Sequence, residues 1–437
     1  MWFTVTPAEN GALTRKGPNN GLCSDRHSVG QLGVPVSTGH FAGPAIVGPE
    51  GVMFKMAVGY SEDVDEHDAI VEALDMAVGH LGDLTPAAGV LFAGHDYDHR
   101  ALVSEIMARF PEIKLIGCVA DGQMSSESGY ADDGVTLTLF ASDLITFSAG
   151  IGDKLSADPL LATRRAAEQA LAGSDGTPAL AIVFPDLLQS DLGAVVEALR
   201  SVLGASVPIV GGASAAEDLR ANPWVSHQFF NDSVHADSLP LLLLSGPLKF
   251  SVSIAHGWSP MGKPATVTRS ERNKVALVGE QTIMDYYRGY IGDDVASLWA
   301  NPLAVSQDQG GFILRAVIGT DDAARTASFM GEVPVGSTVR VSMATVPDIL
   351  DAAARSVGDA MASFPGPGRP EGALLVSCAM RRMLLGTRAA EEVAGFRTRV
   401  GSDVPMIGFY AWAEIGPLAD GVSRLHNATF VTVLLGT

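Results

Sequence analysis

The feature that most constrains this chain is a unit that occurs three times along it. Each copy contains an apolar strand, a loop, an amphipathic helix, a second apolar strand ending near a glycine, and a polar loop. Internal repeats of this kind define an architecture before any single motif does. The first strands lie at residues 89–92, 179–184 and 372–378, and the second strands lie at residues 113–118, 207–212 and 404–409.

The composition of these strands predicts an α/β fold. Uninterrupted Val, Ile and Leu strands joined by a helix are buried on both faces, which is typical of parallel βαβ crossovers. An alternating or apolar stretch follows each copy, near residues 134–140, 241–244 and 429–435, and predicts added antiparallel strands. We therefore expect repeated βαβ units with added antiparallel strands, forming mixed sheets flanked by helices and arranged in two modules.

The helix of the second copy has the clearest pattern. Ser190 or Asp191 can cap its N-terminus. Its apolar residues recur at helical spacing and form one stripe: Leu192, Val195, Val196, Leu199, Val202 and Leu203. Further helices are predicted at residues 63–81, 100–110, 347–364 and 385–400.

The length of 437 residues predicts two to three domains at roughly 100–200 residues each. We place one module at residues 53–248 and a second at residues 249–437. Residues 1–52 contain nine Gly and five Pro without sustained periodicity, so we expect a disordered arm or an over-extended reading frame there.

The charge balance excludes several classes of partner. The chain has 49 Asp+Glu against 29 Lys+Arg, a net charge of −20, which repels nucleic acid and anionic membrane surfaces. It has no unbroken apolar run long enough for a membrane span. Its three cysteines are too few for a disulfide framework, and its ten histidines form no H-E-x-x-H or comparable motif. His95 and His99 are the one pair with helix-ligand spacing, and they indicate a polar loop that opens a helix, with a metal site as the alternative. These observations predict a cytoplasmic protein without a metal, nucleic-acid or membrane partner.

The loops at the carboxyl ends of the strands are the expected ligand-facing positions, because ligands of parallel α/β sheets bind there. Gly211 and Gly212 would let the backbone approach a ligand closely, with Ser214 as a hydrogen-bond donor. Neither a phosphate-binding Walker loop nor a dinucleotide fingerprint is present. The alternative interpretation is a tight turn that lets sheet and helix pack.

Two cysteines near predicted strand ends are also candidate site residues. Cys378 ends a strand and Arg381 follows it, so a helix N-terminus and a guanidinium could lower the pKa of its thiol. The alternative for Cys378, and equally for Cys118, is a small buried structural residue.

Aromatic and imidazole side chains complete the candidates. Tyr410 and Glu414 could form an aromatic wall with one carboxylate that holds an ammonium group, or they could simply pack in the core. His256 and His426 stand singly beside strands, which is typical of structural histidines, with an axial haem ligand as the alternative.

The C-terminal part carries a more specific pattern, with Val-Pro-Met-Ile-Gly-Phe-Tyr at 404–410, Glu-Ile-Gly-Pro at 414–417 and His-Asn-Ala-Thr-Phe at 426–430. With these motifs the chain resembles the FIST family, in which a FIST-N module precedes a FIST-C module. The glycine loop at 210–214 and the Ala-His-Gly-Trp at 255–258 fit the same resemblance. The chain departs from the family pattern at residues 117–122 and 411–413.

The resemblance implies a stand-alone sensory module of bacterial type, not an enzyme. It implies binding of an amino acid or related metabolite and signalling through a histidine kinase or another separate protein. One similar branch implies a haem-binding, nitric-oxide-responsive sensor, with His256 or His426 as axial ligand. The competing class is a thiol or acid–base hydrolase using Cys378 or Cys118. The ligand-binding candidates are Cys118, Gly211, Gly212, Ser214, Cys378, Arg381, Tyr410, Glu414, His426 and Asn427.

Overall fold

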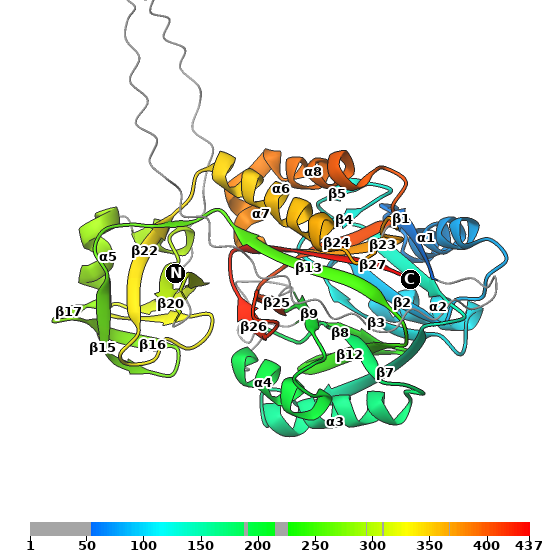
Figure 1. Cartoon of the computed structure of the whole chain (residues 1–437), viewed down its shortest axis with the longest axis horizontal. Helices are drawn as coiled ribbons and strands as arrows, with labels where there is room; N and C mark the ends of the chain where they lie inside the picture. The colour runs from blue at the N-terminus through cyan, green and yellow to red at the C-terminus, as the bar shows by residue number, and fades with distance from the viewer. Residues whose placement is uncertain (1–53, 188–190, 215–225, 294, 308–309, 367) are drawn as a thin grey trace, which may run out of the picture.

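The computed structural model describes residues 54–187, 191–214, 226–293, 295–307, 310–366 and 368–437. The predicted arm at residues 1–52 lies outside these ranges. Within them the chain is an α/β protein of helices and mixed sheets, which confirms the predicted fold class. Helices cover the outer faces of the sheets (Figure 1). No helix of the described ranges is long and apolar enough to cross a membrane.

The predicted threefold repeat is present. The first unit contains β1 (Lys55–Ser61), α1 (Glu66–Leu81), β2 (Ala88–Ala93), α2 (His99–Arg109), β3 (Lys114–Val119), β4 (Gln123–Ser125), β5 (Gly129–Ala131) and β6 (Val135–Ala141). The second contains β7 (Thr146–Asp153), α3 (Pro159–Ala172), β8 (Pro178–Val183), α4 (Leu192–Leu203), β9 (Ile209–Gly212), β10 (Gln228–Phe230), β11 (Ser233–His235) and β12 (Ser238–Ser245).

The third unit has the same order of elements. It contains β13 (Lys249–His256), α6 (Val346–Ser363), β23 (Gly372–Cys378), α7 (Ala379–Leu385), α8 (Ala390–Val400), β24 (Met406–Ala411), β25 (Glu414–Pro417), β26 (Ser423–His426) and β27 (Thr429–Gly436). The helix predicted at 385–400 corresponds to α8, which begins later, at Ala390, and a separate helix, α7, precedes it. Gly386, with φ +52°, follows α7 and ends it, because glycine adopts positive φ without a steric penalty.

The three units exchange strands in a cycle. Three six-stranded sheets share one plan, with orders β1-β6-β2-β3-β10-β11, β7-β12-β8-β9-β25-β26 and β13-β27-β23-β24-β4-β5. The two middle strands of the βαβ unit are parallel and the other pairs are antiparallel. In each sheet the last hairpin belongs to another unit. This exchange was not predicted from the sequence.

One glycine in each sheet fixes the register of the exchange. A Cβ at Gly117, Gly211 or Gly408 would lie 2.0, 2.0 or 2.4 Å from a carbonyl oxygen of the neighbouring parallel strand, so no larger residue fits. The exchanged hairpin starts opposite the residue that follows this glycine. Its first residues are Gln228 opposite Cys118, Glu414 opposite Gly212, and Gln123 opposite Phe409.

The inner faces of the sheets share one core. The rings of Phe92, Phe184 and Phe409, one from each unit, contact one another with centroids 4.5–5.5 Å apart. Burying three aromatic side chains against one another stabilises the junction of the units through area and ring geometry together. The three units therefore form one body.

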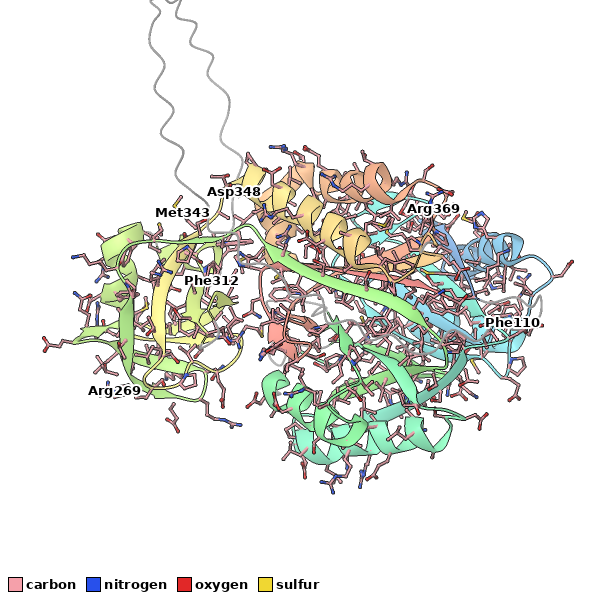
Figure 2. All side chains as sticks on the ribbon, viewed as in Figure 1. Phe110, Arg269, Phe312, Met343, Asp348 and Arg369 are labelled. Atoms are coloured by element: carbon pink, nitrogen blue, oxygen red, sulfur yellow. The ribbon has the colours of Figure 1, made fainter. Side chains whose placement is uncertain are left out.

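A separate sheet is inserted into the third unit between β13 and α6, and it lies at the left of Figure 1. Its strands and helix are β14 (Ser259–Pro260), β15 (Ala265–Glu271), β16 (Lys274–Val278), β17 (Gln281–Thr282), α5 (Ile283–Ile291), β18 (Leu303–Ser306), β19 (Phe312–Arg315), β20 (Val317–Asp321), β21 (Thr326–Phe329) and β22 (Thr338–Met343). We call this segment the insert. It was not predicted, and Phe312 lies on its side that faces the body (Figure 2).

Candidate functional site

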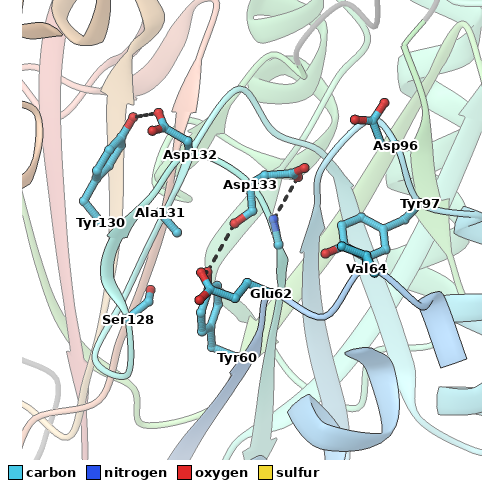
Figure 3. A pocket seen from close by; sticks show the side chains of 11 residues that line it. Tyr60, Glu62, Val64, Asp96, Tyr97, Ser128, Tyr130, Ala131, Asp132 and Asp133 are labelled. Atoms are coloured by element: carbon cyan, nitrogen blue, oxygen red, sulfur yellow. Dashed lines mark hydrogen bonds between the residues drawn. The ribbon is translucent and has the colours of Figure 1, made fainter. Parts of the chain in front are cut away.

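A cleft of about 690 Å³ opens in the first unit (Figure 3). It lies between the end of β1, the loop that follows β2, and the β4–β5 hairpin with the turn into β6. Tyrosine and carboxylate side chains dominate its walls. The lining residues are Tyr60, Glu62, Val64, Asp96, Tyr97, Ser128, Tyr130, Ala131, Asp132, Asp133 and Gly134.

The tyrosines of the cleft are held in place and neutral. Tyr60 donates to Glu62 Oε2 at 3.2 Å and to the Asp133 carbonyl at 3.3 Å, and Tyr97 donates to the Asp63 carbonyl at 2.8 Å. Burial, followed by nearby carboxylates, raises the pKa of Tyr97 to about 12. Burial likewise raises the pKa of Tyr130 to about 12. The rings therefore offer apolar faces and fixed hydroxyl groups at neutral pH.

The charge of the cleft comes from four exposed carboxyl side chains, those of Glu62, Asp96, Asp132 and Asp133. Hydrogen bonds from Tyr130 and then Arg382 lower the pKa of Asp132. Asp133 Oδ1 accepts from the Gly134 amide at 2.8 Å. No lysine or arginine is among the lining residues, so the cleft as described is acidic.

Arg382 of α7 connects this cleft to the third unit. Its Nε donates to the Tyr130 hydroxyl at 2.8 Å, its Nη2 to Asp132 Oδ1 at 2.8 Å and its Nη1 to Asp121 Oδ1 at 2.7 Å. Gly122, with φ +94°, leaves room for the guanidinium, because a Cβ there would lie 3.0 Å from Nε. Arg381 and Arg382 both follow Cys378 in the sequence, but only Arg381 was a predicted site residue.

Arg381 and Tyr410 are committed to a buried network. Arg381 is fully buried and donates to Glu392 Oε1 from Nε at 2.9 Å and from Nη2 at 2.6 Å. Glu392 Oε2 accepts from the Ser377 hydroxyl at 3.0 Å and from the Tyr410 hydroxyl at 2.9 Å. The Tyr410 ring packs edge-to-face on Tyr130, with centroids 5.8 Å apart, so the network touches the back of the cleft. Glu392 was not a predicted site residue.

Glu414 lies at the start of β25, fully buried. Its Oε2 accepts from the Thr429 amide at 2.9 Å and the Thr429 hydroxyl at 2.8 Å, whereas its Oε1 has no hydrogen-bond partner among the described residues. Burial raises the pKa of Glu414 to about 7, against the opposing effects of Thr429, Cys378 and Arg381. This carboxyl group is therefore poised between its two protonation states at neutral pH.

The two described cysteines are buried thiols. Burial, and then the neighbouring Glu414, raise the pKa of Cys378. Burial, and then Asp186, raise the pKa of Cys118. A raised thiol pKa disfavours the thiolate that a nucleophilic cysteine needs, so neither thiol is activated as the hydrolase alternative requires.

The glycines and Ser214 of the second unit have local roles. A Cβ at Gly212 would lie 2.6 Å from the Ala411 Cβ, so close packing explains this glycine. Ser214 Oγ accepts from the Ser226 hydroxyl at 2.6 Å and from Gln228 Nε2 at 2.8 Å. Gly212 of β9 lies directly opposite Glu414 of β25, and Ser214 follows Gly212 by two residues.

The candidate haem ligands His426 and His256 differ in their hydrogen bonds. His426 Nε2 donates to the Gly416 carbonyl at 3.0 Å, and Asn427 Oδ1 accepts from the Ala316 amide of the insert at 3.0 Å. His256 Nδ1 is buried and has no partner among the described residues. Burial lowers the pKa of both imidazoles to about 4, so both are neutral at pH 7. The bond to Gly416 does not fit an axial role through Nε2 of His426; the haem hypothesis rests on His256 and stays a prediction.

The structure thus gathers part of the predicted set around the third unit. Six of the candidates belong to this unit. Cys378, Tyr410 and His426 lie at or next to the carboxyl ends of their strands, Arg381 lies in α7, Glu414 begins β25, and Asn427 follows β26. None of the ten candidates lines the cleft. The signal that could have pointed to the cleft was present, because an acidic and tyrosine-containing loop follows a buried strand at residues 94–99.

Residues 87–280 match the FIST N domain, and residues 284–417 match the FIST C domain. The chain therefore belongs to the FIST family. An uncharacterized protein of Mycobacterium tuberculosis is 25% identical over 398 residues, which cover 86% of this chain and 98% of that protein. An uncharacterized protein of Mycobacterium bovis is 22% identical over 389 residues, which cover 86% of this chain and 97% of that protein.

Two solved structures of cyanuric acid hydrolase, one of them from A. caulinodans, align over 87% and 88% of this chain and 98% and 100% of their own. Their sequence identity is 10% and their TM-scores are 0.37 and 0.36. A likeness at this level transfers neither fold nor activity.

Proposed function

We propose that this protein is a sensory module that binds a small amine-bearing metabolite, such as a basic amino acid, in the cleft of the first unit. It passes the bound state to a separate signalling protein, of which a histidine kinase is one candidate. Membership of the FIST family supports the sensory role. The cleft volume of about 690 Å³ is within the range of ligand pockets, roughly 300–1,000 Å³.

The observation that carries this proposal is the lining of the cleft. Four carboxylates, of which Asp132 is already paired with Arg382, attract a cation, and the faces of three tyrosines stabilise an ammonium or guanidinium group. At the edge of the cleft, Asp132 and the Tyr130 hydroxyl already bind a cation, the guanidinium of Arg382, through hydrogen bonds. A net charge of −20 favours the same sign of ligand at long range. A ligand with net negative charge would be repelled.

Arg382 couples ligand binding in the cleft to a contact between the first and third units. An ammonium group that binds Asp132 competes with Arg382 for the same carboxylate. Arg382 belongs to α7 of the third unit, whereas Asp132 belongs to the first. Binding would therefore alter a contact between two units, and a ligand shifts a conformational equilibrium only through such a difference in affinity.

A thermal-shift screen of the full chain tests the proposal. We expect L-arginine, L-lysine and putrescine to raise the melting temperature, and L-glutamate to leave it unchanged. A Glu62→Gln/Asp96→Asn variant should lose the response, because it removes two of the four carboxylates. The matched control is Asp322→Asn, which removes an exposed carboxylate of the insert. A response that glutamate shares, or that the double variant keeps, would count against the cleft.

A further inference from the structure

The strand exchange brings three side chains to equivalent positions. Gln123, Gln228 and Glu414 each begin an exchanged hairpin, each lie opposite the residue that follows the register glycine, and each are fully buried. Each also bonds the residue at the entry to the last strand of its own unit. The bonds are Gln123 Nε2 to the Gly134 carbonyl at 2.6 Å, Ser238 Oγ to Gln228 Oε1 at 3.0 Å, and Thr429 Oγ1 to Glu414 Oε2 at 2.8 Å.

The two glutamines show how the fold satisfies this position. Gln123 Oε1 accepts from the Thr136 hydroxyl at 2.5 Å, in addition to the bond made by its Nε2. Gln228 Nε2 donates to Ser214 Oγ at 2.8 Å and to Asp186 Oδ2 at 3.3 Å. Both ends of both amides are therefore occupied. At the third position the Oε1 of Glu414 has no nitrogen or oxygen donor among the described residues, and beyond Thr429 the carboxyl group has only the weak thiol donor of Cys378.

The charge at the third position is also uncompensated. Arg381 is the cation whose field favours ionised Glu414, but it forms its ion pair with Glu392 at 2.6 Å. Cys378, beside Glu414, is a neutral thiol and a weak donor. A buried carboxylate without a counterion is costly, and it must acquire either a proton or a cation.

A second buried polar atom without a partner among the described residues lies on the strand paired with Thr429. His256 and Thr429 are directly opposite in the β13–β27 ladder, so their side chains lie on one face of the sheet. Thr429 in turn bonds Glu414. His256 Nδ1 is buried and unpartnered within the described ranges, and its imidazole is neutral at pH 7. Phe312 of the insert covers the imidazole, with ring centroids 4.9 Å apart.

We infer that Glu414 Oε1 and His256 Nδ1 form a second, buried site that binds an ammonium group, either free ammonium or the primary ammonium of a small molecule. The N–H groups of such a ligand match the Glu414 oxygen and, in the tautomer with its proton on Nε2, the His256 Nδ1, and its charge supplies the missing counterion. The site lies on the third unit beneath the insert and shares no lining residue with the cleft. It does not depend on the proposed function of the cleft.

Melting temperatures of the full chain at equal ionic strength and about pH 8 test this site. We expect ammonium chloride and methylammonium chloride to stabilise the protein relative to sodium chloride. Tetramethylammonium chloride should give no stabilisation through this site, because it carries the charge but has no N–H donor. Stabilisation by methylammonium but not ammonium would assign the site to primary amines, and equal stabilisation by both would assign it to the ammonium group itself.

Two variants make the test specific. Glu414→Gln should fold, because glutamine occupies both equivalent positions, and it should weaken the ammonium effect by at least about tenfold in midpoint concentration. His256→Leu should weaken it as well. The cleft variant Glu62→Gln/Asp96→Asn should keep it, so that failure of the cleft proposal does not affect this one. Equal ammonium responses in wild type and Glu414→Gln, or no response in wild type, would overturn the inference.

Discussion

At the scale of single residues, the chemistry of this protein depends on a few buried polar groups whose partners are incomplete. Most buried polar side chains near the third unit are satisfied, as in the Arg381–Glu392 pair with its donors Ser377 and Tyr410. Glu414 is different, because one of its oxygens has no partner within the described part of the chain and burial holds its pKa at about 7. Its titration therefore falls in the physiological range.

The stability of the protein should depend on pH through Glu414. Its pKa rises from an ordinary 4.5 to about 7 on folding, so the unfolded chain ionises first. The free energy of unfolding should therefore fall as pH rises from about 4.5 to 7, by about 3 kcal/mol from this group, and stay level above that range. Urea unfolding of wild type and Glu414→Gln at several pH values measures the difference. Parallel pH profiles for the two proteins would contradict the assignment.

The residues of the candidate sites were only partly predictable. Cys378, Arg381, Tyr410 and Glu414 stand at strand ends or in family motifs, and the structure does bring them together. Whether they bind a ligand stays a prediction. The cleft was missed because its walls come from several short segments, and no spacing in the sequence shows that Tyr60 meets Asp133.

At the scale of elements, the exchanged hairpins hold the units together. The β4–β5, β10–β11 and β25–β26 hairpins each complete a sheet of another unit. Long apolar strands and amphipathic helices made the βαβ repeat visible in the sequence. Strands of three or four residues, such as β4 and β10, are too short to show a period, so the exchange and much of the insert were not predictable from pattern.

Substitution of a register glycine should disrupt this arrangement. In Gly117→Ala the new Cβ would lie 2.0 Å from the Leu91 carbonyl oxygen, so the β2–β3 pair has to separate. We expect a large loss of melting temperature or failure to fold. The control is Gly319→Ala, where a Cβ meets nothing within 4 Å and φ is not positive. Thermal unfolding followed by circular dichroism measures both, and similar melting temperatures would show that the register does not depend on Gly117.

At the scale of the whole molecule, the cleft and α7 join the first and third units. Arg382 bonds Tyr130 and Asp132 on the cleft side and lies next to Arg381, which is anchored in the third unit. Under the proposed function, a ligand in the cleft would act at a contact between two units, where a sensory module needs a conformational change.

Arg382→Gln should separate binding from response. Removing the guanidinium frees Asp132, so an amine ligand should bind more tightly. The ligand-dependent change in amide hydrogen exchange over α7 (Ala379–Leu385) should disappear, because the competing contact no longer exists. Arg388→Gln is the control, since its exposed guanidinium bonds Glu391 outside the cleft. Unchanged affinity and an unchanged exchange response in Arg382→Gln would exclude this coupling.

The most direct measurement of the central claim is a calorimetric titration of the full chain with the best-binding amine from the screen, alongside the Glu62→Gln/Asp96→Asn variant. We expect saturable binding that weakens as sodium chloride is added, and an affinity at least about tenfold lower in the variant, equivalent to about 1.4 kcal/mol. Identical affinities in the two proteins would contradict the assignment of the cleft as the ligand site.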